Sequence, residues 1–396
     1  MLLNKRNIDF CYSLDVGKTT KDKQLKMRTD KLCVVSRFDN DAEMNETYVS
    51  LESMNHAKSK KYRVQYIRTN EEKPYRKALL IRGKKKNSPV LLRIDYSPIN
   101  RNTGGIRLDF RPQHMTPQKI DHLLSWINRQ LGEICYQLLA RAWITQIDVA
   151  LDVYNCKLDD YIWGLERSGK TAYFNKEDGL PGIRIGSYRS LLHFLCYGKI
   201  DANSGRKLVF QERAKFININ FDEYQQFLRI EARYRPNATP TSKNGNVLML
   251  AHILEMRNPF ERLRVYSKDL GDALLDRRYL YALPNAPSIA EMKRYMMDAM
   301  QCSRLPRKVD RLIAEYEIEL FDKHTVWMQW SRCVAQLSGI FSIASDSVYI
   351  IVYILKIWSR ENSIKSINKH HYSIFRSRCL IGWCRQHHPL LFLIHS

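Results

Sequence analysis

Residues 144–154 (ITQIDVALDVY) are the feature that most restricts how this chain can fold. Aliphatic side chains occupy every odd position from Ile147 to Val153, and the stretch has no glycine or proline. This period of two predicts a strand with one buried apolar face. The other face carries Asp148 and Asp152. Burying a carboxylate in so apolar a strand is costly unless a metal ion, an arginine or a proton compensates it, and all three remain open.

Two further stretches alternate charged and apolar residues in the same way. They are residues 107–111 (RLDFR) and 229–235 (RIEARYR). Alternation puts each charged set on one face of its strand. If the three strands are neighbours, at the usual spacing of about 4.8 Å, Asp109, Asp148 and Glu231 converge on one sheet face.

Such a set of carboxylates suits Mg²⁺ or Mn²⁺, because hard cations prefer oxygen ligands. The equally weighted alternative is a face of cross-strand ion pairs without a metal. Asp152 lies four residues from Asp148, about 13 Å along an extended strand, so the two cannot share one ion without a bulge. We expect Asp152 either to support a metal ligand from behind or to pair with an arginine on the phosphate side. The arginines between the acids suit a bound phosphodiester, and the expected DNA contacts on these strands are Arg107, Arg229 and Arg233.

The remaining pattern predicts an α+β fold with a largely antiparallel central sheet flanked by helices. Strands are expected at 5–13, 78–82, 90–94, 106–112, 183–187, 191–199 and 228–235. The tip of the hairpin between the second and third of these carries Lys84, Lys85 and Lys86, which suit backbone phosphates. Thr116 and Pro117 predict a helix start, and apolar residues keep helical spacing as far as Leu138.

Composition shifts predict four segments. Residues 1–235 form the main domain, and 236–246 form a linker rich in Pro, Asn and Thr. A helical pattern broken by prolines predicts a smaller all-α domain at 247–341, with a role in DNA recognition or other accessory contacts. Residues 342–396 are an atypical basic tail, interpreted as divergent or out of frame.

The charge of the chain favours a polyanionic partner. Its 396 residues include 64 Lys and Arg against 41 Asp and Glu, a formal net charge of +23. Nucleic acid is favoured over a membrane surface, and the alternative is a basic protein with no such partner. Nine cysteines without a CxxC pair indicate reduced thiols in a cytoplasm. The apolar run at 348–355 is too short to span a membrane, so no stable membrane association is expected.

Two familiar site patterns are weak in this chain. Residues 15–20 (DVGKTT) lack the first glycine of a phosphate-binding loop, so they are interpreted as a turn. Cys379, Cys384, His387 and His388 form a cluster without a convincing zinc-site scaffold. Neither pattern is taken as a functional site.

Phosphodiester chemistry on the charged face requires a nucleophile. A tyrosine would form a covalent phosphotyrosine that keeps the bond energy for rejoining. Tyr197 ends an apolar strand and is followed by Gly198 and Lys199, whose amine could contact phosphate or the phenolate. Tyr188, within the sequence GSYR, is the competing candidate.

Four ordered blocks resemble the replication-initiation-factor family, the rolling-circle initiators of small staphylococcal plasmids and related phages. They are residues 106–112, 146–152, 185–199 and 228–231. The resemblance implies a nicking-closing enzyme acting in a bacterial host cytoplasm, with Tyr197 as nucleophile and Lys199 beside it. It implies that Asp109, Asp148 and Glu231 are acidic metal positions, with Asp152 and Asp9 less likely. Arg184 and Arg189 are two further expected DNA contacts.

The expected partners are origin DNA, a host helicase with the replication machinery, and a second copy of the chain in a homodimer. The alternative function is a non-enzymatic basic regulator that binds phage or plasmid DNA, whose charged face is only ion pairs.

Overall fold

The computed structural model describes residues 14–56, 59–69, 73–85, 88–175, 180–201, 226–236 and 247–341. These residues all belong to the first of two compact units, which spans residues 1–347. The strand expected at 5–13, nearly all of the expected linker and the tail from 342 lie outside the described residues. Within the described part, no helix is both long and apolar enough to cross a membrane.

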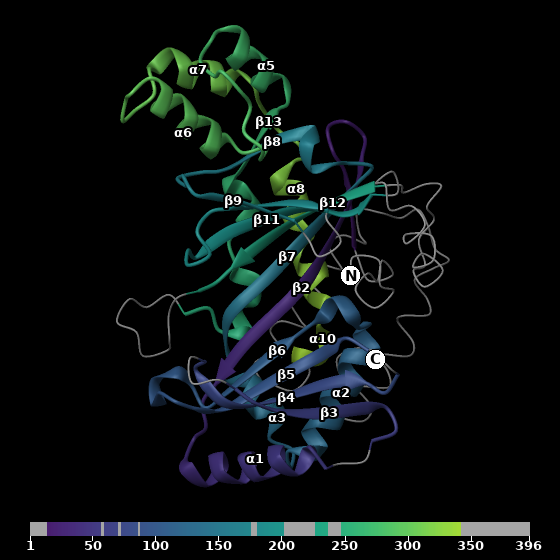
Figure 1. Ribbon diagram of the computed structural model, residues 1–396. Helices are drawn as coiled ribbons and strands as arrows, with labels where there is room; N and C mark the ends of the chain where they lie inside the picture. The colour runs from purple at the N-terminus through teal and green to yellow at the C-terminus, as the bar shows by residue number, and fades with distance from the viewer. Residues whose placement is uncertain are drawn as a thin grey trace, which may run out of the picture. The chain divides into compact units, whose positions relative to one another are not determined.

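A large antiparallel sheet forms the centre of the fold (Figure 1). Its strand order is β3-β4-β5-β6-β2-β7-β12-β11-β10-β9, and β1 pairs with β2 beside this path. The strands are β1 (Leu14–Lys18), β2 (Gln24–Ser36), β3 (Tyr62–Arg68), β4 (Tyr75–Gly83), β5 (Val90–Pro98), β6 (Ile106–Phe110), β7 (Trp143–Tyr154), β9 (Thr171–Asn175), β10 (Pro181–Ile185), β11 (Leu192–Asp201) and β12 (Gln226–Tyr234).

Strand β7 is the strand expected at 144–154, and it lies near the middle of the sheet. Its aliphatic residues are fully buried, and Asp148 and Asp152 are buried as well. On one side β7 pairs with β12, where Arg233 lies opposite Asp148 and Arg229 opposite Asp152. These two charged strands are therefore neighbours, which meets one part of the condition under which their acids were expected to converge.

On its other side β7 pairs with β2, a strand that the sequence patterns did not predict. Because β2 lies between β7 and β6, Asp109 is one strand further from Asp148 than expected. The register of β2 against β7 shifts between Thr29 and Lys31, so Asp30 is an extra residue in a β-bulge. This bulge interrupts the alternation by which a strand is recognised in sequence.

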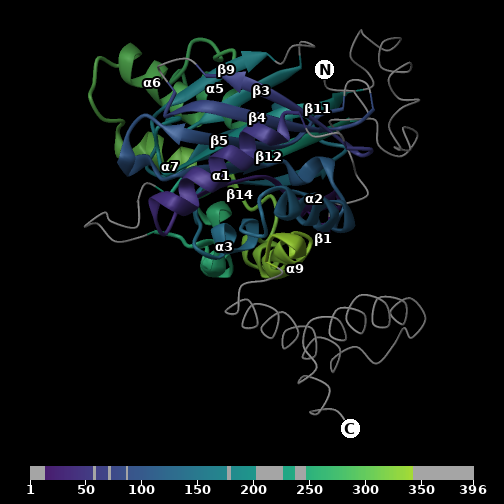
Figure 2. The ribbon, with the colours of Figure 1, turned by 90° about the horizontal axis from the view of Figure 1, so that it is seen from below.

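Helices cover the apolar face of the sheet. They are α1 (Asp41–Met54), α2 (Pro117–Gln130), α3 (Cys135–Ala140), α8 (Lys323–Met328), α9 (Trp330–Ala335) and α10 (Ser338–Phe341). Figure 2 shows α2, α3 and α9 together on one side of the strands. Ring contacts join Phe194 of β11 to Phe260, and Tyr62 of β3 to Trp126 of α2. By alternation, the face that carries Arg233 is the opposite one.

The long helix expected from Pro117 to Leu138 is two helices. Thr116 caps the first as predicted, because its hydroxyl accepts a hydrogen bond from the Lys119 amide. The break lies at Gly132 and Glu133, which have φ angles of 64° and 69°. A left-handed backbone cannot continue a right-handed helix, so α3 starts anew after this turn.

Residues 247–341 are mainly helical, and they also contribute strands. Helices α5 (Asp269–Asp276), α6 (Ile289–Ala299) and α7 (Arg307–Glu315) share a hydrophobic core with Leu274, Met296 and Leu312. Beside them, β13 (Leu263–Ser267) pairs with β14 (Glu317–Ile318) and with β8 (Tyr161–Leu165) from the first part of the chain. Short 3-10 helices span Arg101–Thr103, Pro112–His114, Leu158–Asp160, Leu250–Glu255 and Pro259–Arg262.

Candidate functional site

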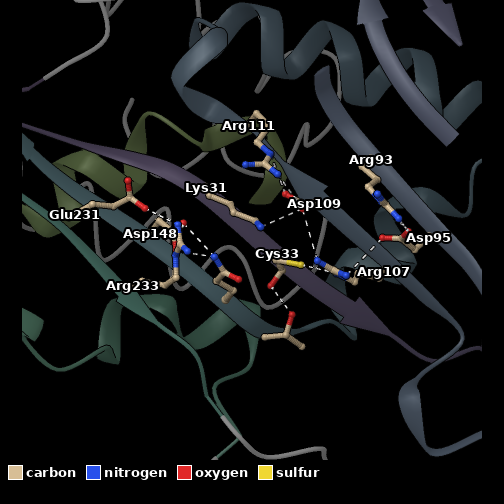
Figure 3. Close-up of polar contacts among 12 residues, drawn as sticks. Lys31, Cys33, Arg93, Asp95, Arg107, Asp109, Arg111, Asp148, Glu231 and Arg233 are labelled. Carbon is tan, nitrogen blue, oxygen red and sulfur yellow. Dashed lines mark hydrogen bonds and ion pairs between the residues drawn. The ribbon is translucent and has the colours of Figure 1, made fainter. Parts of the chain in front are cut away.

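A continuous charged face crosses the sheet from β5 to β12 (Figure 3). Carboxylates at its base are almost completely buried, with residue exposures of 1–4%. Arginines above them remain partly exposed, with side-chain values of 27–35%. The acids are Asp95, Asp109, Asp148 and Glu231, and the arginines are Arg93, Arg107, Arg111 and Arg233. Buried carboxylates thus orient guanidinium groups that face outward.

Asp109 lies in a group of three cations. Its carboxylate is 3.2 Å from Lys31 Nζ, 3.2 Å from Arg111 Nε and 3.6 Å from an Arg107 nitrogen. Arg107 also donates to the Cys33 thiol at 2.9 Å. The cations therefore compensate the charge of Asp109, and Lys31 of β2 stands between it and β7.

Asp148 and Glu231 share one arginine. Arg233 lies 3.1 Å from Asp148 Oδ2 and 2.7 Å from Glu231 Oε1, and Gln146 also donates to both Asp148 oxygens. Burial raises the pKa of Asp148 to about 7, and the charge of Glu231 contributes to this increase. Arg233 is therefore an ion-pair partner shared by two buried carboxylates that repel each other.

Tyr197 lies beside this pair. Its hydroxyl donates a hydrogen bond of 3.0 Å to Glu231 Oε2. The side chain is 3% exposed, and burial, followed by the charge of Glu231, raises the pKa of Tyr197 well above 10. The phenol is therefore protonated at neutral pH, with a carboxylate in position to accept its proton.

A second, fully buried network holds the same strands together. Arg229 donates to Asp152 at 2.6 and 2.8 Å and to Asp30 at 2.8 Å. Arg28 lies 3.5 Å from Asp152. The expected DNA contact by Arg229 is contradicted by this placement, because its side chain has no exposed surface. The positive charge of Arg229 compensates Asp152 and Asp30 in the protein interior.

The residues expected to hold one metal ion do not gather in this structure. Among the described residues, no group of three or more His, Cys, Asp or Glu side chains could hold a metal ion. Asp109 is separated from Asp148 by β2, and Arg233 occupies the space between Asp148 and Glu231. An octahedral Mg²⁺ needs several oxygens within about 2.1 Å, so the arrangement does not fit that ion.

The other expected DNA contacts lie at two ends of the sheet. Lys84 and Lys85 are exposed at the β4–β5 hairpin tip. Arg184 is the last residue but one of β10, and Arg189 follows in the loop that carries Tyr188. Lys86 and Asp9 lie outside the described residues, as does the side chain of Lys199.

Sequence reasoning missed two residues that matter at this face. Lys31 lies on the unpredicted strand β2, where the bulge hides the alternation. His193 lies opposite Arg233 in the β11–β12 register, and its position within an apolar run was the only signal. Arg235, by contrast, continues the odd-numbered charges of residues 229–235 and could have been included.

Comparisons with known proteins returned little. No protein-family model and no curated protein matched the chain. Among solved structures, one similar chain is the Rolling Circle Replication Initiator Protein from Geobacillus stearothermophilus. It is 16% identical, the TM-score is 0.29, and the match covers 54% of this chain and 75% of that chain.

Proposed function

We propose that this protein is a rolling-circle replication initiator that nicks one DNA strand and later rejoins it. The observation that carries the proposal is the hydrogen bond between the Tyr197 hydroxyl and Glu231, with Arg233 on the same carboxylate. A tyrosine nucleophile, a proton acceptor and a cation for phosphate are the parts that a phosphotyrosine mechanism needs.

In the proposed reaction, the Tyr197 oxygen attacks phosphorus and its proton passes to Glu231. The bond between phosphorus and the 3′ oxygen breaks, and that oxygen takes a proton from solvent. The 5′ phosphate stays on Tyr197, and the free 3′ hydroxyl serves as a primer. In rejoining, a 3′ hydroxyl attacks the phosphotyrosine and the phenol is restored. The proposed reaction uses only side chains of the protein, because the described residues do not fit Mg²⁺ or Mn²⁺.

Arg233 is the proposed contact for the reacting phosphate. Its side chain is 29% exposed and is held by two carboxylates. Guanidinium groups bind phosphate oxygens through paired donors. Because Tyr197 is buried, a local opening must expose its hydroxyl before the strand can react, and we expect DNA binding to favour that opening.

Helix α7 is the proposed contact for duplex origin DNA. Its residues Arg307, Lys308 and Arg311 are exposed and form no ion pair with any described residue. Together with the net charge of +23, this surface supports sequence-independent attraction to phosphates. Lys84 and Lys85 are the second proposed contact. The proposal also includes a host helicase as partner, a homodimer and a location in the bacterial cytoplasm. Within the proposed family, residues 1 to about 341 of this chain resemble a replication protein of a filamentous vibriophage.

The test is a suicide oligonucleotide that carries the nick site, scored as a covalent adduct on a denaturing gel. Wild-type protein forms the adduct, Tyr197→Phe does not, and Tyr188→Phe is the matched control that does. An adduct that persists in Tyr197→Phe and disappears in Tyr188→Phe would move the nucleophile to Tyr188.

A second candidate is a basic DNA-binding regulator without enzymatic activity. It is favoured by the ion pairing of every buried carboxylate on the charged face and by the burial of Tyr197. In that case wild-type protein binds origin DNA and forms no adduct with any oligonucleotide that spans the origin, with or without added Mg²⁺ or Mn²⁺.

A further inference from the structure

Tyr188 is an exposed aromatic residue held between two arginines. It is 49% exposed and lies in the loop between β10 and β11. The Arg184 and Arg189 guanidinium groups lie 5.6 and 5.4 Å from its ring centre, and Arg189 Nε donates to its hydroxyl at 2.9 Å. Arg235, the residue after β12, donates to the Tyr188 carbonyl at 2.7 Å and so links this loop to the end of that strand.

These arginines differ from those on the charged face because they lack acidic partners. Arg184, Arg189 and Arg235 form no ion pair with any described residue, whereas Arg93, Arg107, Arg111 and Arg233 all do. Three guanidinium groups therefore gather at one end of the β10–β11 hairpin without compensation. Such a concentration of positive charge attracts an anion.

The buried side chain of His193 is affected by the positive charge of these arginines. His193 is 1% exposed, and neither its Nδ1 nor Arg184 Nε has a hydrogen-bond partner among the described residues. Burial lowers the pKa of His193 to about 4, and the charges of Arg233, Arg235 and Arg184 act in the same direction. With a pKa near 4, His193 is neutral at neutral pH, so the positive charge of the cluster comes from the arginines.

We infer that Tyr188, Arg184, Arg189 and Arg235 form a binding subsite for single-stranded DNA. The arginines hold one backbone phosphate, and the exposed ring of Tyr188 stacks against a neighbouring base. This assignment deepens the proposed function and rests on it for the identity of the strand.

The location of the subsite supports a role beside the reacting bond. His193 lies opposite Arg233 across β11 and β12, and Arg184 lies opposite Leu195, two residues before Tyr197. All these side chains are on the charged face of the sheet. A strand held at Tyr188 would therefore continue along β11 toward Tyr197. A single strand is favoured over a duplex, because only an unpaired base offers its face to an aromatic side chain.

The experiment measures the anisotropy of a fluorescent oligo(dT) of about 12 nucleotides, within the range of known single-strand sites. This probe has no origin sequence, so binding is measured without nicking. Tyr188→Ala is expected to weaken binding about tenfold, because stacking of one base contributes about 1–3 kcal/mol. Tyr188→Phe keeps the ring and stays within about twofold of wild type on the same scale.

Arg184→Gln and Arg235→Gln are each expected to weaken binding and to reduce the slope of log K against log salt by about 0.7. Arg63→Gln is the matched control, since Arg63 is exposed on β3 at the opposite end of the strand order. Equal losses in Arg63→Gln, unchanged binding by Tyr188→Ala, or an equal loss of binding to a duplex of the same length would each overturn the assignment.

The two proposals fail separately. If wild-type protein forms no covalent adduct but Tyr188→Ala still loses oligo(dT) binding, the nicking function fails and the subsite stands. Thermal melts of each variant by circular dichroism identify any loss that comes from unfolding, and Tyr188→Phe then serves as the variant that preserves packing.

Discussion

The Tyr197 hydroxyl donates a hydrogen bond of 3.0 Å to Glu231 Oε2, although the two residues are only 3% and 4% exposed. Register explains the contact. Tyr197 lies opposite Arg229, and Glu231 lies opposite Leu195, so Tyr197 and Glu231 are diagonal neighbours on one face of β11 and β12. The sheet itself thus brings the proposed nucleophile to its proton acceptor.

Glu231→Gln tests the role of that carboxylate. Glutamine can still accept a hydrogen bond from the phenol, but it cannot take the proton. We expect the rate of covalent adduct formation to fall by about 10²-fold or more, within the range for a lost general base. Oligonucleotide binding should change little. The measurement is a single-turnover time course, and an adduct rate equal to that of wild type would show that the proton goes elsewhere.

Asp152→Asn tests the buried network behind the site. Arg229 and Arg28 would keep their buried positive charges but lose their shared anion, leaving Asp30 as an acidic partner of Arg229. Breaking a buried ion pair by removing one partner typically destabilises a protein by about 3–5 kcal/mol. We expect urea denaturation to show a loss of that order.

The control for this change is Asp22→Asn, which removes the exposed pair between Lys18 and Asp22. Asparagine tolerates the positive φ of this position, and exposed pairs contribute less than about 1 kcal/mol. If both variants lose the same stability, the buried network has no special role in holding β7, β12 and β2 together.

Strands β7 and β2 show how much of the fold could be predicted from the sequence. Strand β7 was predictable because four aliphatic residues at odd positions define one continuous apolar face. Its pairing with β12 was only assumed as a condition, because alternating charges place residues on a face without fixing which strands are neighbours. Strand β2 was not predictable, because the bulge at Asp30 and the continuous run Leu32 to Val35 break its alternation.

Because β2 was not predicted, Asp109 was expected to lie closer to Asp148 than it does. With β2 inserted, Asp109 meets Lys31 and cannot join Asp148. Choosing between a metal, an arginine and a proton also depended on tertiary neighbours. The structure surrounds Asp109 with basic side chains, gives Asp148 an arginine and a raised pKa, and gives Asp152 arginines alone.

Arg233→Met tests why Asp148 and Glu231 do not form an ion site. In wild type the guanidinium lies between the two carboxylates, at 3.1 and 2.7 Å. Without it, two adjacent carboxylates would attract a hard divalent cation. We expect Arg233→Met to bind one more Mn²⁺ than wild type when free Mn²⁺ is followed by electron paramagnetic resonance.

The opposite result for Mn²⁺ would restore the sequence-based expectation. If wild type binds Mn²⁺ tightly and Asp148→Asn abolishes that binding, Arg233 must move away in solution and the carboxylates act as ligands. The double variant Arg233→Met, Asp148→Asn should not bind the additional Mn²⁺ that Arg233→Met binds, because it lacks one of the two carboxylates.

Asp148 should make stability depend on pH in an unusual direction. Its pKa is about 7 in the folded protein, against 3.8 for a free side chain. Between these values the folded state holds a proton that the unfolded state has released. Stability therefore falls as pH rises from about 4 to about 7, with a slope near 1.4 kcal/mol per pH unit from this group, and the loss is complete above pH 7.

Urea denaturation of wild type and Asp148→Asn across pH 4–8 isolates this contribution, because all other titrating groups are shared. The difference between the two curves should decline from pH 4 and level off near pH 7. In a Glu231→Gln background the decline should end at lower pH, since the charge of Glu231 is the second cause that raises the pKa of Asp148. Parallel curves for wild type and Asp148→Asn would mean that Arg233 and Gln146 keep the carboxylate ionised throughout.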